Sequence, residues 1–291
     1  MPPSGLINLY KPAGMTSRQA VDRVERLVRP ARAGHAGTLD PLATGVLIVC
    51  VGSATRLIEY VQQMPKTYRG MFLLGRSSLT EDVEGEVTEL SDPPVPSREQ
   101  IAAACRAFCG EIAQRPPAFS ALKVAGRRAY ELARKGKPVE LAPRTVSVYG
   151  IEVVAYEYPR LTLEVQCGAG TYIRSLGRDL AESLGTAAVM AALERTAIGI
   201  FPIAEAVAPE QLTCDKWTQH LLPTLRAVEQ LPRIDLSAAE VARIRNGLRI
   251  ARPDVSAEHT ELAACDPAGE LVGILTPCGG GALKTLRNLP V

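Results

Sequence analysis

GHAGTLDPLATG at residues 34–45 leads directly into the apolar run VLIVCV at residues 46–51. An uninterrupted apolar run of this length predicts a central strand that is buried on both faces. The glycines in front of it predict a loop that allows a ligand to approach the backbone. Within this loop the ring of Pro41 restricts Asp40 to an extended backbone and so fixes the direction of its side chain.

The chemistry of this loop remains open when it is considered alone. An Asp before a Pro is usually a turn or capping residue. The loop has neither the Gly-Lys-Ser/Thr of a phosphate-binding loop nor the H-E-x-x-H of a zinc protease. His35 either contacts a bound partner or only satisfies the loop. Because no nucleophilic Ser or Cys is paired with His35, a hydrolase triad is not indicated.

Strand-like and helix-like segments follow one another on both sides of this loop. We expect strands at residues 5–9, 46–51, 68–74, 146–155 and 161–167, and helices at 20–28, 54–61, 101–108 and 174–184. Thr16 with Gln19 and, further on, Ser97 are expected to cap two of these helices. Since the order lacks a regular strand–helix–strand alternation, it predicts an α+β fold with a mixed, mostly antiparallel sheet flanked by helices.

The character of the sequence changes near residue 230. A helix over 222–232 is expected to run into a connector, followed by a helix at 237–246, strands at 262–264 and 271–275, and a glycine turn at 279–281. We therefore expect a domain at residues 1–231 and a small β-rich module at 232–291. The second segment is too short for another catalytic domain.

Composition limits the class of protein further. The chain has 291 residues, a net charge of +2, 46% hydrophobic and 22% charged residues, which excludes a disordered chain. Its longest apolar run, 46–51, is too short to cross a membrane, and the N-terminus has no secretory pattern, so we expect a cytoplasmic protein. The seven cysteines form no C-x-x-C pair, which predicts buried free thiols and no metal site.

The small net charge conceals a strong local asymmetry. Seven basic residues against two acidic ones give the segment 123–144 a local charge of +5, whereas the segment 81–92 carries six acidic residues and no basic one. The basic residues include Lys123, Arg127, Arg128 and Arg134, and Tyr130 lies among them. Such a segment is either a solvated face or a surface that follows nucleic-acid phosphates.

A third cluster lies at residues 168–176, GAGTYIRSL. A strand is expected to end in its glycine turn, and a helix to begin near Arg174. An Arg at a helix N-terminus is unfavourable for the helix dipole, and conflicts of this kind are expected at functional sites. Arg174 could pair with a buried carboxylate or hold a phosphate.

Together, these segments resemble the TruB-type family of tRNA pseudouridine-55 synthases. The resemblance rests on motifs in the family's order: Gly5 to Ser17, Gly34 to Leu47, Lys66-Thr67-Tyr68, Arg115 to Lys123 with Arg128 to Arg134, Gly170 to Leu176, and Leu193 to Thr196. They cover roughly residues 5 to 200. The tail after residue 232 is more loosely similar to the family's PUA-type RNA-binding module.

This resemblance implies a pseudouridine-synthase-like fold and isomerisation of uridine-55 in the T loop of tRNA. The reaction needs no cofactor. Asp40 would be the essential carboxylate, attacking C1′ of the ribose or C6 of the ring, or acting first as a base at C2′. The sequence does not choose among these routes.

The resemblance also implies roles for other residues. Tyr68 would stack on the target base, Arg174 would pair with Asp40, and Tyr172 and Leu193 would line the pocket. His35 would fill or support the space that flipped nucleotides leave. Lys123 would contact the substrate. The patch of Arg127, Arg128 and Arg134 would hold T-arm phosphates.

The partner implied is the T arm of tRNA, bound by a monomer that needs no protein partner and no membrane. Two other functions are consistent with the same residues. One is a tRNA-folding factor, which could coexist with catalysis. The other is the related guide-RNA-dependent synthase, which the compact chain disfavours.

Overall fold

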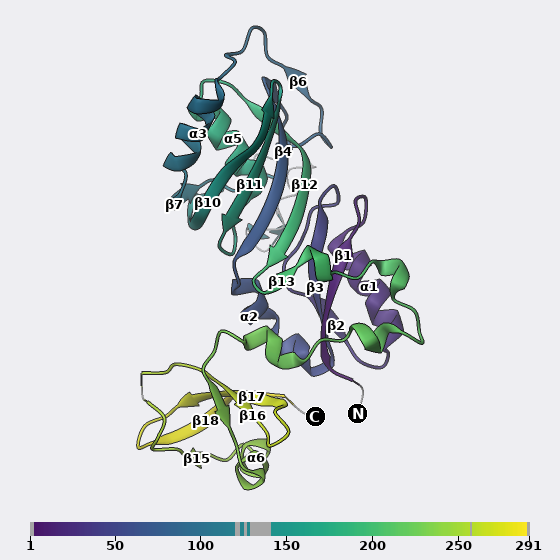
Figure 1. Cartoon of the computed structure of the whole chain (residues 1–291), viewed down its shortest axis with the longest axis vertical. Coiled ribbons are helices and arrows are strands. Elements are labelled where there is room, and N and C mark those ends of the chain that lie inside the picture. The colour runs from purple at the N-terminus through teal and green to yellow at the C-terminus, as the bar shows by residue number, and fades with distance from the viewer. Residues whose placement is uncertain (1–2, 120–122, 125–126, 129–140, 257, 290–291) are drawn as a thin grey trace.

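The computed structural model describes residues 3–119, 123–124, 127–128, 141–256 and 258–289. A large sheet and its helices form the upper and middle parts of the molecule in Figure 1, and the C-terminal segment forms a separate lobe below them. This is the α+β architecture with mostly antiparallel strands that the sequence predicts. None of the helices in the described ranges is long and apolar enough to span a membrane.

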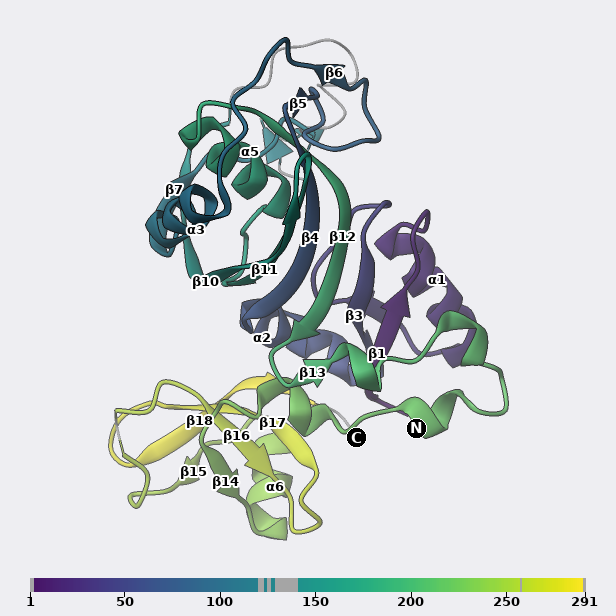
Figure 2. The same ribbon diagram turned by 45° about the horizontal axis from the view of Figure 1, so that its top comes forward.

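The large sheet has the strand order β1-β3-β12-β4-β11-β10-β7, with β2 also paired to β3 and β13 to β12. In chain order its strands are β1 (Gly5–Lys11), β2 (Ala33–His35), β3 (Thr44–Val51), β4 (Lys66–Leu74), β7 (Gly110–Gln114), β10 (Arg144–Glu157), β11 (Arg160–Cys167), β12 (Ala188–Ile198) and β13 (Phe201–Pro202). All pairings are antiparallel except that of β12 with β3, which is parallel. Figure 2 shows β4 and β12 side by side through the middle of this sheet.

Strand β3 is buried on both faces, as its apolar run predicts. Val46, Ile48 and Cys50 face one hydrophobic cluster, while Leu47 and Val49 face another that includes the apolar side of the first helix. In the sheet β3 lies between β1 and β12. Because the 34–45 loop runs directly into β3, the end of this loop is held at the centre of the molecule.

The helices of the structure are α1 (Ser17–Val28), α2 (Ile58–Gln63), α3 (Arg98–Ala107), α5 (Ile173–Ser183) and α6 (Ala238–Arg245). Capping boxes at Thr16 and Ser97 start α1 and α3, as the sequence predicts. Helices α3 and α5 pack on the same face of β4, β10 and β11 through one shared core. Short strands also pair as β5 (Arg76–Ser77) with β6 (Thr88–Glu89) and β8 (Lys123–Val124) with β9 (Arg127–Arg128).

Two local predictions need correction. The helix expected at 54–61 is a 3₁₀ turn, Gly52–Leu57, that continues into α2. The helix expected at 222–232 is only a 3₁₀ turn at Thr224–Val228, which begins directly after Pro223. Strand β12 was not predicted, and two shifts of register interrupt its alternation.

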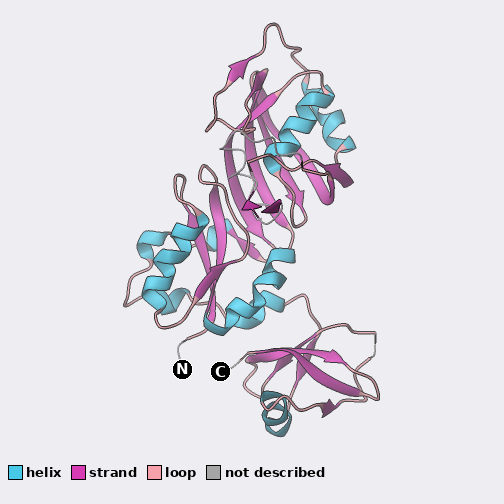
Figure 3. Ribbon diagram, turned by 180° about the vertical axis from the view of Figure 1, so that it is seen from behind, coloured by secondary structure: helices cyan, strands magenta, loops and turns pink. Residues whose placement is uncertain are grey.

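The C-terminal module is a five-stranded sheet with the order β14-β16-β17-β18-β15. Its strands are β14 (Arg233–Asp235), β15 (Ile250–Ala251), β16 (Leu262–Cys265), β17 (Leu271–Pro277) and β18 (Ala282–Asn288). Helix α6 covers the face that is turned away from the rest of the molecule, as the view from behind shows (Figure 3). The expected helix, both expected strands and the glycine turn are present, and β18 follows the turn.

The cysteines are free, but not all are buried. Cys50, Cys105, Cys167 and Cys265 are buried, as expected, whereas Cys109 and Cys214 are exposed and Cys278 is intermediate. The prediction of buried thiols is therefore wrong for Cys109 and Cys214. Cys109 lies beyond the last residue of α3, so it does not share a helix face with Cys105.

Candidate active site

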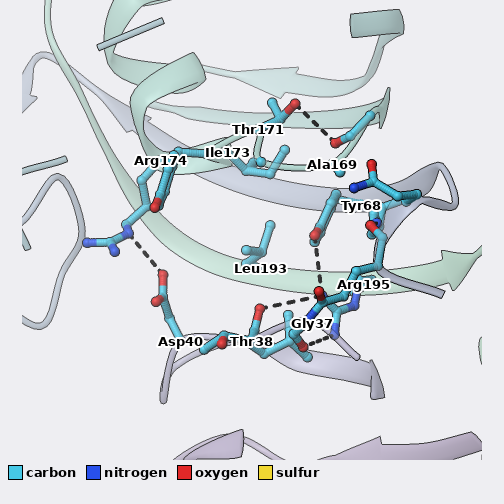
Figure 4. Close-up of a pocket in the computed structure, with 17 residues that line it drawn as sticks. Gly37, Thr38, Asp40, Tyr68, Ala169, Thr171, Ile173, Arg174, Leu193 and Arg195 are labelled. Carbon is cyan, nitrogen blue, oxygen red and sulfur yellow. Dashed lines mark hydrogen bonds and ion pairs between the residues drawn. The ribbon is translucent and has the colours of Figure 1, made fainter. Parts of the chain in front are cut away.

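A cavity of about 360 Å³ lies between the 34–45 loop, β4, β12 and the start of α5. Its lining comprises Gly37 to Asp40, Gln62, Gln63, Lys66, Tyr68, Gly168 to Arg174, Leu193 and Arg195. Figure 4 shows that Asp40 and Arg174 point toward each other on one side of this cavity, and that Tyr68 and Arg195 meet on the other. Four motifs that are far apart in the sequence thus converge on one hollow.

The backbone around Asp40 is fixed from α1 and β1. The buried hydroxyl of Ser17 accepts a hydrogen bond from the Leu39 amide at 2.8 Å and donates one to the Leu39 carbonyl at 3.1 Å. The ammonium of Lys11 donates to the carbonyls of Met15 and Pro41 at 2.6 and 3.3 Å. Burial lowers the pKa of Lys11 to about 8, although the nearby Asp40 carboxylate opposes this shift.

Arg174 is the centre of a network with two carboxylates. Its Nε lies 3.0 Å from Asp40 Oδ2, and its Nη1 lies 3.2 Å from Asp82 Oδ2. The side chains of Arg174 and Asp82 are 6% and 4% exposed, while that of Asp40 is 37% exposed. The guanidinium also donates to the carbonyls of Thr80 and Phe119 at 2.7 and 3.1 Å. Asp40 is therefore held by a fixed cation and still reaches the cavity.

The opposite side of the cavity carries an aromatic ring over a second buried guanidinium. Tyr68 is 8% exposed and Arg195 is 1% exposed. Arg195 Nη1 donates to Tyr68 Oη at 3.4 Å, and its central carbon lies 5.9 Å from the ring centroid. Burial raises the pKa of the Tyr68 phenol, although the Arg195 charge opposes this shift. The phenol is therefore neutral at pH 7.

Tyr172 and Leu193 also line the cavity, as the resemblance implies. Tyr172 is the residue before α5, and the side-chain amide of Gln114 binds both its backbone N–H and its carbonyl, at 2.8 and 3.0 Å. The guanidinium of Arg144 lies 5.8 Å from the centroid of the Tyr172 ring. Leu193 comes from β12 and is buried.

Other expected site residues lie outside this cavity or outside the described side chains. His35 is half-buried on β2 and does not line the cavity. Burial lowers the pKa of His35, and the charges of Arg195 and Arg18 lower it further. The backbone of Lys123, Arg127 and Arg128 belongs to β8 and β9, but their side chains and the whole of Arg134 lie outside the described part of the chain.

Three residues of the site were not predicted from the sequence. Asp82 is one of six acidic residues in its segment, Lys66 belongs to the motif of Tyr68, and Arg195 belongs to the motif of Leu193. An Arg or Lys at an inward position of a strand was the available signal, since such residues are seldom fully buried without a reason. For Asp82 the sequence offers no such signal, because its partner Arg174 is 92 residues away.

No group of three or more His, Cys, Asp or Glu side chains among the described residues could hold a metal ion. The chemistry available in the cavity is that of one accessible carboxylate, a buried phenol and several cations. An arrangement of this kind suits nucleophilic or base catalysis on a neutral, flat substrate.

Comparison with known families gives matches over most of the chain. Residues 25–173 match the family described as TruB family pseudouridylate synthase (N terminal domain). Residues 231–290 match the family described as tRNA Pseudouridine synthase II, C terminal.

Curated relatives and solved structures agree with these matches. The chain is 39% identical to tRNA pseudouridine synthase B of Arthrobacter sp. (strain FB24), over 99% of the chain and 97% of that protein. It is 43% identical to the protein of the same name from Caulobacter vibrioides, over 85% and 81%. The fold is similar to that of a chain in the archaeal box H/ACA sRNP Nop10-Cbf5 complex, with a TM-score of 0.74 and 26% identity over 98% of this chain and 86% of that one.

Proposed function

Given that the chain belongs to the TruB family of pseudouridine synthases and is an isomerase that acts on uridine in tRNA, we propose that its target is uridine-55 of the T loop and that Asp40 is the essential carboxylate. The observation that carries this proposal is the position of Asp40. It is an accessible carboxylate at a cavity, held at 3.0 Å by a buried arginine. The reaction breaks the N1–C1′ bond, turns the base and joins C5 to C1′.

The cavity supports roles for the residues around Asp40. Its volume of about 360 Å³ is in the range of small-molecule sites, and it can receive a nucleotide only after that nucleotide leaves the RNA stack. Tyr68 would stack on the flipped base, with Leu193 and Tyr172 as further walls. Arg174 would hold the Asp40 carboxylate in place through their ion pair. Because the cavity accepts only a nucleotide that has left the stack, we include base flipping in the proposed mechanism.

Outside the cavity, the assignments follow from charge and position. We propose that Lys123, Arg127, Arg128 and Arg134 contact the T arm, because the segment 123–144 has a local charge of +5. His35 would support the RNA loop beside the cavity rather than contact the reacting base, because it does not line the cavity.

The division into residues 1–231 and 232–291 is proposed as a catalytic domain and a PUA-like RNA-binding module. Its support is the separate five-stranded sheet that begins at Arg233. We further propose a cytoplasmic monomer, with tRNA folding as a second role of the same RNA-binding surface. A growth defect that is rescued by an Asp40 variant would reveal that second role.

Mapping of pseudouridine in tRNA tests the main proposal. The purified protein is incubated with unmodified tRNA, and the modified position is read by chemical labelling and primer extension. We expect one product at position 55. Asp40→Asn should abolish it while leaving the dissociation constant for a T stem-loop within about threefold, and Asp215→Asn, at an exposed position, should behave as wild type.

Turnover by Asp40→Asn, or a product at another position, would contradict the proposal. The similarity to a chain of an H/ACA particle makes one further comparison useful. Activity of the purified protein on an isolated T stem-loop supports a stand-alone enzyme, whereas dependence on added guide RNA and protein partners would overturn it.

A further inference from the structure

Two buried cations line the cavity opposite Asp40. The exposed fractions of Lys66 and Arg195 are 6% and 1%. Among the described residues, no carboxylate oxygen lies within 4.0 Å of a side-chain nitrogen of either residue. Buried charges are normally paired, so two unpaired cations at one cavity require an explanation.

The neighbours of these cations do not supply a negative charge. Lys66 donates to the carbonyls of Gln62 and Met64, the latter at 2.6 Å. Arg195 donates to the carbonyls of Val46 and Gly37 at 2.7 and 3.1 Å. Carbonyls satisfy donors but carry no net charge.

Two ionisable side chains near these cations also remain neutral at pH 7. Burial raises the pKa of the Cys167 thiol, beside Lys66, to about 11. The Tyr68 phenol, beside Arg195, has a pKa above its ordinary value. Within the described part of the chain, the groups around these cations therefore do not compensate the positive charge on this side of the cavity.

The reaction moves negative charge toward this side of the cavity. If Asp40 attacks C1′, the electron pair of the broken N1–C1′ bond stays on N1 and the base becomes an anion. If Asp40 removes the C2′ proton, the same bond breaks and again leaves the base as an anion. If Asp40 attacks C6, the electron pair of the 5,6 double bond passes into the ring as an enolate. In each route Asp40 loses the charge and the uracil gains it.

We propose that Lys66 and Arg195 form a pair of fixed cations that stabilises the uracil anion. This anion is present while the base is detached from the ribose or is bonded to Asp40 through C6. This inference rests on the proposed function, since it needs Asp40 as the group that gives up the charge. When C5 then joins C1′, Asp40 is released from C1′ or from C6, or returns its proton to C2′, and so regains its negative charge. The C5 proton leaves, N1 gains a proton and the ring is neutral again. The cation pair thus stabilises the charged intermediate and not the neutral substrate or product. Such selective stabilisation lowers the barrier of the reaction.

The way the cations are held suits a base that must turn. Most of their hydrogen bonds go to backbone carbonyls, so their charge reaches the cavity mainly as a field rather than as a directed bond. A directed hydrogen bond to N1 would resist rotation of the ring, whereas a field from a fixed cation persists as the ring turns. Tyr68 covers Arg195 with its ring and offers the base a flat surface.

A leaving-group comparison tests this assignment. Single-turnover cleavage of the N1–C1′ bond is measured for T stem-loops that carry either uridine or 5-fluorouridine at the target position, with wild type, Lys66→Met and Arg69→Met. Fluorine stabilises the uracil anion by itself. We expect Lys66→Met to slow cleavage by about tenfold or more with uridine and clearly less with 5-fluorouridine.

Arg69→Met is the matched control. Arg69 lies on the same strand, on the exposed face, with an ion pair to Glu164 at 3.3 Å. Its cleavage rates should equal those of wild type with both substrates. Thermal unfolding and the dissociation constant for the stem-loop are measured for every variant, so that a loss of structure is seen directly.

An equal loss with both substrates would overturn the inference, because a purely structural role of Lys66 slows both to the same extent. If Lys66→Met does not fold, the comparison is made between Lys66→Arg and Lys66→Gln. The ratio of the cleavage rates with uridine and 5-fluorouridine is then compared, and an equal ratio in both variants would count against the inference.

A wild-type product outside the T loop would refute the proposed position alone, and the same comparison is then made at that uridine. A wild type without any isomerase activity would refute both.

Discussion

At the scale of single residues, the sequence indicates that Arg174 has a partner of opposite charge but does not identify that partner. Its position at a helix N-terminus is unfavourable for the helix dipole, and this conflict indicated a partner of opposite charge. From the sequence alone, this partner could be either a carboxylate or a phosphate. The structure contains two carboxylates at this guanidinium, Asp40 at 3.0 Å and Asp82 at 3.2 Å. The unfavourable position is thus compensated by two ion pairs, of which the one with Asp82 is buried.

Asp82 should therefore matter to both stability and catalysis. Asp82→Asn keeps the shape but removes the buried negative charge, so Arg174 retains one carboxylate instead of two. We expect the free energy of unfolding to fall by about 1.5–3 kcal/mol and the isomerisation rate to fall by about tenfold or more, because Arg174 is no longer fixed.

Urea unfolding and single-turnover kinetics measure these two effects. Asp92→Asn, an exposed position in the same loop, is the control and should change neither. An Asp82→Asn protein with the stability and rate of wild type would show that Asp40 alone holds Arg174.

Lys66 should make the isomerisation rate depend on alkaline pH. Burial, followed by the charge of Arg195, lowers the pKa of Lys66 to about 8. The charge is present below that pH and is lost as the pH rises through it, so the rate should decline above pH 8. Lys66→Arg stays charged throughout and should move this decline to higher pH.

The groups that face Lys66 allow this comparison. Cys167, with a pKa of about 11, stays neutral near pH 8. Arg195 is the same in both proteins. Lys11, with a pKa of about 8, changes its charge in this pH range, but it does so in both proteins and therefore does not affect the comparison. Coincident pH profiles of kcat for wild type and Lys66→Arg would rule out Lys66 as the origin of the decline.

At the scale of elements, helix α1 acts as a support for the catalytic loop. Its first residue, Ser17, is buried and exchanges two hydrogen bonds with the backbone of Leu39, next to Asp40. Ser17→Ala leaves the Leu39 amide without its acceptor, which costs about 1–3 kcal/mol. We expect this stability loss together with a lower isomerisation rate.

Thr16→Ala is a matched comparison at the adjacent residue. It removes the cap of the same helix and should cost about 1 kcal/mol, but Thr16 has no hydrogen bond to the catalytic loop. Thermal unfolding and kinetics should show a loss of stability in both variants and a loss of rate only in Ser17→Ala. Equal rates in the two variants would mean that the Ser17 contacts do not position Asp40.

Helix α5 lies so close to β4 that one of its residues must be glycine. A Cβ on Gly177 would lie 2.1 Å from Cε1 of the buried Phe72 ring. Helix propensity alone would make Gly177→Ala stabilising by about 1 kcal/mol. We expect the opposite, a loss of about 1–3 kcal/mol by chemical denaturation, because the ring or the helix must shift.

Glu182→Ala, at an exposed position of the same helix, serves as the control for helix propensity and should leave stability nearly unchanged. A Gly177→Ala protein more stable than wild type would show that the core around Phe72 can adapt.

Elements with a local signal were predictable, and those without one were not. The capping boxes at Thr16 and Ser97 and the apolar run of β3 lie within a few neighbouring residues, and each is present as expected. Strand β12 has two shifts of register, which interrupt the alternation by which a strand is recognised. The helix expected at 222–232 had an apolar pattern, but Pro223 and the pairing of Leu222 with Leu6 limit it to a short turn.

At the scale of the whole molecule, the C-terminal module is joined to the large domain by a shared apolar core. Residues of β17 divide between two apolar cores, and shifts in the pairing register interrupt the simple alternation along this strand. Leu271 and Ile274 belong to a cluster with Leu57 and Phe201 of the large domain, while Val272 and Leu275 face the module's own core. The module is therefore packed against its neighbour and is not a freely linked body.

The apolar contact should outweigh the ion pair across this junction. Arg287 lies 2.5 Å from Glu59, but their side chains are 37% and 66% exposed, so Arg287→Ala should cost about 1 kcal/mol or less. Ile274 is fully buried, and Ile274→Ala should cost about 2–5 kcal/mol.

Thermal unfolding of the full chain tests this order. We expect one transition for wild type and Arg287→Ala, and a lowered or divided transition for Ile274→Ala. A larger effect of Arg287→Ala than of Ile274→Ala would reverse the ranking of the two contacts.

The sequence alone determined the class of fold, the position of the α-helices and of most of the long strands, and the motifs that carry the family resemblance. These features depend on caps, on periodicity and on residue types within short segments. Only the tertiary structure decided which groups face the buried cations: Asp82 lies at Arg174, the neutral phenol of Tyr68 at Arg195, and no carboxylate of the described residues at Lys66. The reason is physical, since strand order and helix packing bring residues together across tens to more than a hundred positions, and no local pattern encodes that distance.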